Sequence, residues 1–151
     1  MPKALIVYYS KTGHTESMAM AIAEGMKSVK GIKVIVKRVE EATNRDLLEA
    51  DAIVVGSPTY FRLPAWPVKK FIDESIEVYG MLRGKIGGVF TSTGSRYSGV
   101  ICLKALKDML EEHGINVVGD GILAIEEPNE KELEKCREYG AEIAKRILMA
   151  R

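Results

Sequence analysis

A short polar segment near the start of the chain has the residue types of a phosphate-binding loop. It follows an apolar run, precedes a segment with helical periodicity, and consists of Ser10, Lys11, Thr12, Gly13, His14 and Thr15. The first-turn N–H groups of a helix carry the positive end of its dipole and suit a bound phosphate. The hydroxyl groups can donate to the same oxygens, and the glycine lets the backbone come close. We therefore interpret the segment as a phosphate-binding loop.

Helix capping without any ligand is the alternative interpretation of these six residues. The segment also lacks the Gly-Lys-Ser/Thr sequence of the Walker loop and the three glycines of the dinucleotide fingerprint. We therefore do not expect ATP or NAD to be its natural ligand.

Composition places the chain among ordinary globular domains. It has 151 residues, of which 46% are hydrophobic and 28% charged, and its net charge is +1; we expect one domain, residues 1–151. No basic run with interleaved aromatic residues is present, so a nucleic-acid partner is not expected. The chain begins Met1-Pro2-Lys3 without a signal-like segment and has no apolar run of membrane-spanning length, which predicts a cytoplasmic protein with no membrane partner.

The cysteines and histidines do not form a recognisable reactive or metal-binding motif. Cys102 and Cys136 lie far apart in helical patterns, and we expect free thiols that pack as small apolar groups. With only His14 and His113 available and no C-x-x-C pair, a metal site is not expected.

Strand-like and helix-like patterns alternate along the whole sequence. Strands are predicted at residues 4–9, 32–39, 52–56, 86–91 and 116–125, with helices at 14–29, 44–50, 68–76, 102–114 and 129–147. This alternation predicts an α/β fold, a doubly wound five-stranded parallel sheet in a three-layer sandwich. Lys33 and Lys37 mark the second strand as an edge, which favours the strand order 2-1-3-4-5. Gly119-Asp120-Gly121 predicts a bulge or break in the fifth strand.

In that strand order, the loops after the first, third and fourth strands meet at the carboxyl ends of the strands. We predict that residues 57–67 form an aromatic-rich loop and residues 92–99 a polar loop with glycines. Aromatic faces bind flat rings by burial and offset stacking, and the candidate faces are Tyr60, Phe61, Trp66 and Tyr97. The three loops together predict a site for a phosphorylated planar heterocycle.

On these motifs the chain resembles the flavodoxins, in particular those of the short-chain kind. The segment 10–15 matches the family's S/T-x-T-G-x-T phosphate loop, while 56–60 and 91–94 resemble its two ring-binding loops. The resemblance implies FMN as the cofactor. It implies that the remaining cofactor-binding residues, beyond the phosphate loop, are Pro58, Thr59, Tyr60, Phe61, Arg62, Ser92, Thr93, Gly94, Ser95, Tyr97 and Gly99.

The two ring-binding loops depart from the family in their charge. Familiar flavodoxins surround the ring with carboxylates, whereas residues 57–67 and 91–101 contain no Asp or Glu but do contain Arg62 and Arg96. A cation beside the ring stabilises negative charge on it. The two ring-binding loops therefore lack the acidic shell of the family, and an arginine near the pyrimidine end of the ring would favour the reduced, anionic flavin.

The resemblance favours an electron carrier that contacts other redox proteins transiently. No catalytic residue is predicted, because the flavin carries the chemistry. The alternative is a flavodoxin-like NAD(P)H:quinone oxidoreductase, which the missing carboxylates and the aromatic loop support and the short 126–128 connection opposes. A phosphate-accepting receiver domain is excluded, since Gly56 and Ser10-Lys11 stand where that fold requires acidic residues.

Overall fold

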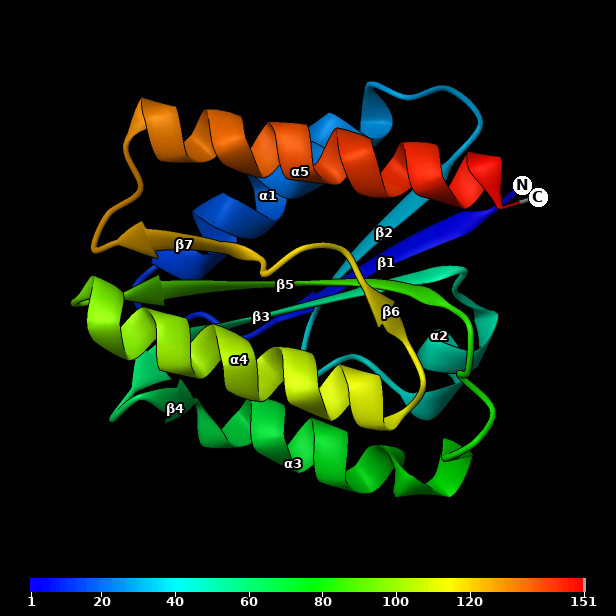
Figure 1. Ribbon diagram of the computed structural model, residues 1–151, viewed down its shortest axis with the longest axis horizontal. Helices are drawn as coiled ribbons and strands as arrows, with labels where there is room; N and C mark the ends of the chain where they lie inside the picture. Colours follow the sequence, from blue (N-terminus) through cyan, green and yellow to red (C-terminus); the bar gives the residue numbers. More distant parts are fainter. Residues whose placement is uncertain (151) are drawn as a thin grey trace.

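A computed structural model of the chain describes residues 1–150, in which helices and strands alternate (Figure 1). The strands are β1 (Lys3–Tyr8), β2 (Lys33–Arg38), β3 (Ala52–Tyr60), β4 (Leu63–Pro64), β5 (Ile86–Thr93), β6 (Asn116–Val117) and β7 (Ile122–Ile125). The helices are α1 (His14–Lys27), α2 (Asn44–Glu49), α3 (Trp66–Glu74), α4 (Arg96–Glu112) and α5 (Glu130–Met149), with a 3₁₀ turn η1 (Ser75–Val78) after α3.

The sheet has the predicted order. Its strands run β2-β1-β3-β5-β6, and β7 pairs with β5 beyond β6; β1, β2, β3 and β5 pair in parallel. The strands β6 and β7 are the two halves of the predicted fifth strand, separated at the predicted break. Gly121 has a φ of 90°, and a Cβ there would lie 2.5 Å from the carbonyl oxygen of Val89, so only glycine fits this bend.

Helices cover both faces of the sheet, which confirms the three-layer sandwich. The helices α1 and α5 lie on one face, and α3 and α4 lie on the other (Figure 1). Residues of β1 alternate between the two cores: Ile6 packs in the core on the α1 side, whereas Leu5 and Val7 pack in the other. Burial on both faces explains why β1 reads as an unbroken apolar run.

Two glycines allow α1 and α5 to pack closely. A Cβ built on Gly25 would lie 1.9 Å from the carbonyl oxygen of Arg137, and one on Gly140 would lie 2.0 Å from that of Ile22. Each helix therefore has a glycine, without a side chain, at the position where the backbone of the other helix approaches it. This contact fixes α1, whose first turn forms part of the site described below.

The segment 57–67 is not the continuous loop that the sequence predicts. The strand β3 continues to Tyr60, because Ser57 and Pro58 still pair with β5. The neighbouring β1 pairs with β3 only as far as Gly56, so Pro58 lies where β3 has lost that neighbour, and proline is tolerated at such an edge.

A two-residue turn then reverses the chain into β4. Tyr60 pairs with Leu63 across the turn, and the turn residues Phe61 and Arg62 have φ values of 51° and 71°. Positive φ at both central positions is the geometry of the tight turns that match the twist of hairpin strands. Glycine or asparagine usually occupies such positions, so Phe61 and Arg62 do not form an ordinary turn signal.

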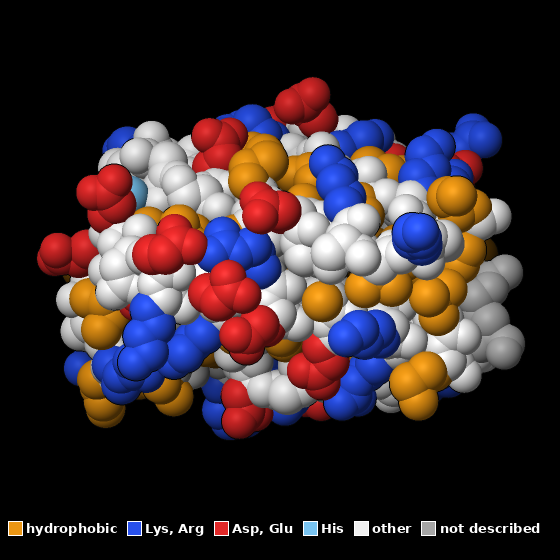
Figure 2. Space-filling view, turned by 90° about the horizontal axis from the view of Figure 1, so that it is seen from above, with side chains coloured by type: hydrophobic (Ala, Val, Ile, Leu, Met, Phe, Trp, Pro, Cys, Tyr) orange, Lys and Arg blue, Asp and Glu red, His pale blue; other side chains and the backbone are white. Residues whose placement is uncertain are grey.

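The surface over α1 and α5 mixes charges of both signs. Figure 2 shows Lys and Arg side chains interspersed with Asp and Glu on this face, and ion pairs on α5 such as Arg146 with Glu142 account for part of the pattern. Within residues 1–150, no helix combines the length and the apolar character that crossing a membrane requires.

Replacing Gly25 with alanine tests the close packing of α1 and α5. We expect Gly25→Ala to lower the free energy of unfolding by about 1–3 kcal/mol, because the new methyl group overlaps backbone atoms of α5. Urea unfolding measures the change. The matched control is Glu24→Ala at the neighbouring exposed position of α1, which should be neutral or slightly stabilising. Equal stability of the two variants would contradict the packing described here.

Candidate functional site

A cavity of about 510 Å³ lies where the carboxyl ends of β1, β3, β5 and β7 meet. This volume is in the range of small-molecule sites. The cavity brings together residues of the three segments that were predicted as loops. Its lining residues are Lys11, Thr12, His14, Pro58, Thr59, Tyr60, Ser92, Thr93, Gly94, Glu126 and Glu127.

The phosphate-binding loop leaves backbone N–H groups available at the start of α1. Gly13 is the N-cap residue with a φ of 95°, a conformation that favours glycine. The Ser10 hydroxyl oxygen accepts hydrogen bonds from the N–H groups of Gly13 (3.1 Å) and Glu16 (3.2 Å). The N–H groups of His14 and Thr15 have no partner within the helix, and none elsewhere in residues 1–150. They are therefore free to bind an anion.

Two residues that the sequence analysis did not select hold this loop in place. Arg38 donates from Nη2 to the carbonyl oxygen of Ser10 at 2.7 Å, and its guanidinium lies 5.5 Å from the centre of the Tyr8 ring. The Tyr8 hydroxyl donates to Glu16 at 2.7 Å. Burial, and then the Glu16 carboxylate, raise the pKa of Tyr8. Glu16 is thereby held by Tyr8 and Arg38 and does not line the cavity.

Hydroxyl groups connect the strand ends beneath the cavity. Thr91 Oγ1 lies 2.6 Å from the carbonyl oxygen of Ser57 and 2.7 Å from Thr59 Oγ1. Because a carbonyl can only accept, Thr91 donates to Ser57 and accepts from Thr59. On the other side of β5, the hydroxyl groups of Thr15 and Ser92 are 2.7 Å apart and buried. These bonds fix α1, β3 and β5 relative to one another.

Ser95 and Gly99 shape the second ring-binding loop and do not line the cavity. The Ser95 hydroxyl oxygen accepts from the N–H of Ser98 and caps α4, and the Ser95 carbonyl accepts from the Thr93 hydroxyl at 2.7 Å. A Cβ on Gly99 would lie 2.7 Å from the Thr93 side chain. Gly99 therefore lets the first turn of α4 approach β5.

Three more of the predicted residues lie beside the cavity. The Phe61 side chain is fully exposed at the hairpin turn, and Tyr97 is 65% exposed. The Arg62 guanidinium lies 4.8 Å from the centre of the Tyr97 ring, so it stacks on this ring and joins the hairpin to α4.

Two carboxylates from outside the ring-binding loops line the cavity. Glu126 and Glu127 follow β7 directly, and the Glu126 N–H donates to the carbonyl oxygen of Thr93 at 2.7 Å. Neither residue belongs to the segments 57–67 and 91–101, which contain no Asp or Glu. The signal was present, since the carboxyl end of the fifth strand lies at the same edge of the sheet.

The sulfur chemistry is as expected from the sequence. Cys102 and Cys136 are both free and buried, and burial raises the pKa of each thiol, to about 12 for Cys136. Neither is a nucleophile at neutral pH. Among the residues described, no group of three or more His, Cys, Asp or Glu side chains could hold a metal ion.

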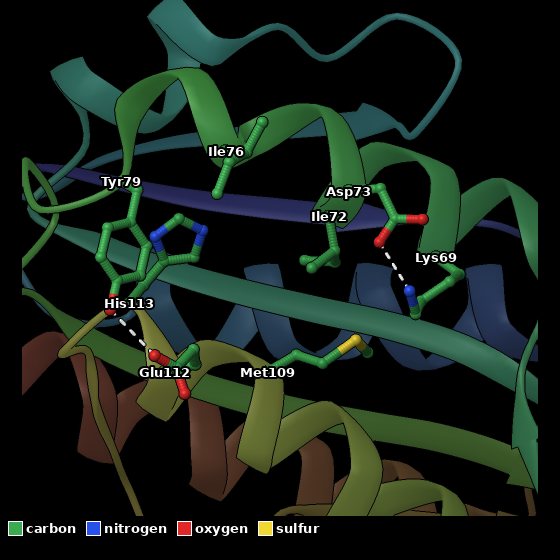
Figure 3. A pocket seen from close by; sticks show the side chains of 8 residues that line it. All are labelled: Lys69, Ile72, Asp73, Ile76, Tyr79, Met109, Glu112 and His113. Carbon is green, nitrogen blue, oxygen red and sulfur yellow. Dashed lines mark hydrogen bonds and ion pairs between the residues drawn. The ribbon is translucent and has the colours of Figure 1, made fainter.

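A larger groove of about 610 Å³ lies between α3, η1 and the end of α4 (Figure 3). Ile72, Ile76, Tyr79 and Met109 supply its apolar lining. It does not include the strand-end loops, so it is separate from the candidate site. His113 is buried behind Tyr79 at one end of the groove.

The bonds around His113 define its tautomer. The Ser75 hydroxyl donates to the carbonyl oxygen of Ile72 at 2.5 Å and lies 2.8 Å from His113 Nε2. Since the hydroxyl hydrogen is used by the carbonyl, Nε2 carries the proton and donates to Ser75. Nδ1 is buried without a partner. Burial lowers the pKa of His113, partly opposed by Glu112, so the folded protein favours the neutral ring.

Comparison with known proteins connects this chain to one family. The family model described as flavodoxin matches residues 6–140. A curated flavodoxin of Aquifex aeolicus (strain VF5) is 37% identical over 95% of this chain and 86% of the relative. A solved flavodoxin from the domain Archaea is 33% identical with a TM-score of 0.87, covering 97% of this chain and 99% of the other. A flavodoxin, WrbA-like protein from Agrobacterium tumefaciens is 29% identical with a TM-score of 0.89, covering 100% of both chains.

The buried histidine predicts a loss of stability in mild acid. The unfolded chain binds a proton at His113 as the pH falls below about 6.5, the ordinary histidine pKa, whereas the folded chain resists protonation. The free energy of unfolding therefore keeps its full value above this pH and decreases as the pH falls below it. We expect His113→Gln to make the free energy of unfolding less dependent on pH between about 7.5 and 5.5. Urea unfolding measures this, with His14→Gln as the control; an unchanged slope in His113→Gln would refute it.

Proposed function

This chain belongs to the flavodoxin family, whose members transfer electrons through bound FMN, and we propose that it is a single-domain cytoplasmic carrier that holds FMN in the strand-end cavity. The observation that supports this placement most directly is the convergence of the three predicted loops on one cavity. When bound, FMN supplies reversible one-electron and two-electron chemistry.

The start of α1 is the phosphate end of the proposed site. The N–H groups of His14 and Thr15 and the positive end of the helix dipole favour an anion there. Thr12 lines the cavity and offers a hydroxyl donor, and Lys11 adds a positive charge. Ser10 and Gly13 act indirectly, because the Ser10 hydroxyl already accepts from backbone N–H groups and Gly13 gives the loop its shape.

The ends of β3 and β5 form the ring end of the proposed site. Pro58, Thr59 and Tyr60 line one side of the cavity, and Ser92, Thr93 and Gly94 line another. Their backbone is held by the hydroxyl bonds beneath the cavity. A rigid lining positions a cofactor without further rearrangement, which lowers the cost of binding.

Electron transfer requires no acid, base or nucleophile from the protein. The residues described here bind the cofactor, exclude water from part of it and set its electrostatic surroundings. Glu126 and Glu127 place negative charge at the cavity, which opposes a negative charge on a bound ring. Partner redox proteins would contact the exposed side of the cavity transiently.

Replacing Thr12 with valine separates cofactor binding from folding. We expect Thr12→Val to weaken FMN binding by about tenfold or more, because one hydrogen bond to a charged phosphate is lost, without changing the stability of the cofactor-free chain. Quenching of flavin fluorescence measures the affinity, and urea unfolding measures the stability.

The matched control is the same substitution at another helix start. The Thr43 hydroxyl caps α2, so Thr43→Val should lower the free energy of unfolding by about 1 kcal/mol and leave FMN affinity unchanged. Unchanged affinity in Thr12→Val would place the phosphate elsewhere.

Direct reaction with NAD(P)H and a quinone is the second candidate function. The exposed aromatic side chain of Phe61, next to the cavity-lining Tyr60, supports it, since such a surface could receive a flat ring. We expect the FMN-loaded protein to oxidise NADH or NADPH with benzoquinone no faster than free FMN does. Steady-state absorbance at the nicotinamide band measures this, and turnover well above the free-flavin rate would favour the enzyme instead.

A further inference from the structure

Exposed aromatic and cationic side chains gather beside the cavity. We define the hairpin patch as Phe61, Arg62, Leu63, Arg96 and Tyr97. Leu63 is 54% exposed, Phe61 and Tyr97 are more so, and both arginines are exposed. The stacking of Arg62 on Tyr97 joins the hairpin to the first turn of α4, so the patch is one continuous surface. It adjoins the cavity, because Tyr60 and Gly94 line the cavity and lie within two residues of the patch in sequence.

The fold does not account for Phe61. Its φ of 51° lies in the left-handed region, which is strained for a bulky side chain. Its side chain is fully exposed, so it contributes no burial in return. Exposed aromatic and arginine side chains of this kind are typical of the centres of protein interfaces.

The two arginines of the patch carry uncompensated charge. Neither Arg62 nor Arg96 has a carboxylate partner anywhere in the part of the chain that the structure describes. Nearby lysines behave differently: Lys69 and Lys70 on α3 each form an ion pair one helical turn away. The sequence contains no Asp or Glu between residues 52 and 72 or between 78 and 107, the stretches that form β3, the hairpin, β5 and most of α4.

The helix termini beside the hairpin add to this positive charge. The helices α1, α2 and α5 carry an acidic residue in their first turn, whereas α3 and α4 carry none. The helix α4 begins with Arg96 at the positive end of its dipole, where a cation is unfavourable. The mixed charges over α1 and α5 (Figure 2) contrast with this one-sign surface.

We propose that the hairpin patch is the docking surface for an acidic redox protein, whose carboxylates face Arg62 and Arg96 and whose apolar surface covers Phe61. The proposal rests on the function proposed above, because docking there would bring the partner next to the cofactor cavity. Glu126 and Glu127 lie on the β7 side of the cavity, so a carboxylate-bearing partner would be oriented toward the hairpin and away from β7.

Two electron acceptors of opposite charge test the proposal. The acidic probe is the soluble haem domain of cytochrome b5, and the basic probe is cytochrome c. Stopped-flow mixing of the reduced, FMN-loaded protein with each probe follows transfer of one electron from FMN to the haem, which reduces Fe(III) to Fe(II). We expect the rate with cytochrome b5 to fall as salt is raised, because salt screens an attraction, and the rate with cytochrome c to rise or stay constant.

Charge reversal localises the effect. We expect Arg96→Glu to slow electron transfer to cytochrome b5 by about fivefold or more at low salt. The substitution should not impair folding, since an acidic residue suits a helix N-terminus. Lys30→Glu is the control: Lys30 is exposed in the turn before β2, at the opposite end of the strands, and the change in net charge is identical. We expect it to alter the rate less than twofold.

The outcomes are distinguishable from failure of the proposed function. Protein that carries no FMN would overturn the proposed function itself, and the yellow absorbance of each preparation records this before mixing. With FMN bound, equal effects of Arg96→Glu and Lys30→Glu would overturn the docking surface, because only net charge would matter. A rate with cytochrome c that falls with salt, or a rate with cytochrome b5 that rises with it, would overturn it as well.

Discussion

The different end points of three neighbouring strands create the cavity on which the rest of the site depends. The strand β1 ends at Tyr8, while β3 continues to Tyr60 and β5 to Thr93. Beyond Tyr8, the space that β1 would occupy is left to the loop leading into α1. Backbone N–H groups at the start of a helix are thereby placed beside two extended strand ends. This arrangement suits an anion at the helix and a flat ring at the strand ends.

Side-chain hydroxyl groups hold this arrangement where the regular sheet pairing ends. The Thr15–Ser92 bond joins α1 to β5, and the Thr59–Thr91 bond joins β3 to β5. Both bonds lie at the carboxyl end of a sheet that is buried on both faces. The helix α1 is also held by its close contact with α5. The protein therefore supplies a rigid frame, and the buried, protonated cysteines leave the redox chemistry to the cofactor.

Much of this could be predicted from the sequence because it depends on local patterns. Unbroken apolar runs indicated the buried strands, the lysines of β2 indicated the edge, and Gly119-Asp120-Gly121 indicated the break between β6 and β7. The turn into α1 was recognisable because its polar residues lie between an apolar strand and an amphipathic helix, while its role in binding phosphate stays a prediction.

The features that the sequence analysis missed depend on contacts between distant segments. Arg38 reaches the Ser10 carbonyl from β2, a contact that no local pattern marks. Glu126 and Glu127 reach the cavity from β7, which only the shared edge of the sheet indicates and not their own sequence pattern. The hairpin turn was missed for a different reason, because Phe61 and Arg62 adopt a conformation that their residue types disfavour.

We propose that this chain holds FMN by its phosphate at the start of α1 and by its ring at the ends of β3 and β5. Titration of the flavin-stripped chain with FMN and, separately, with riboflavin tests it most directly, because riboflavin has the same ring without the phosphate. We expect FMN to bind at least about 100-fold more tightly than riboflavin, the effect of two charge-assisted hydrogen bonds. Equal affinity for the two flavins, or no binding of either, would contradict it.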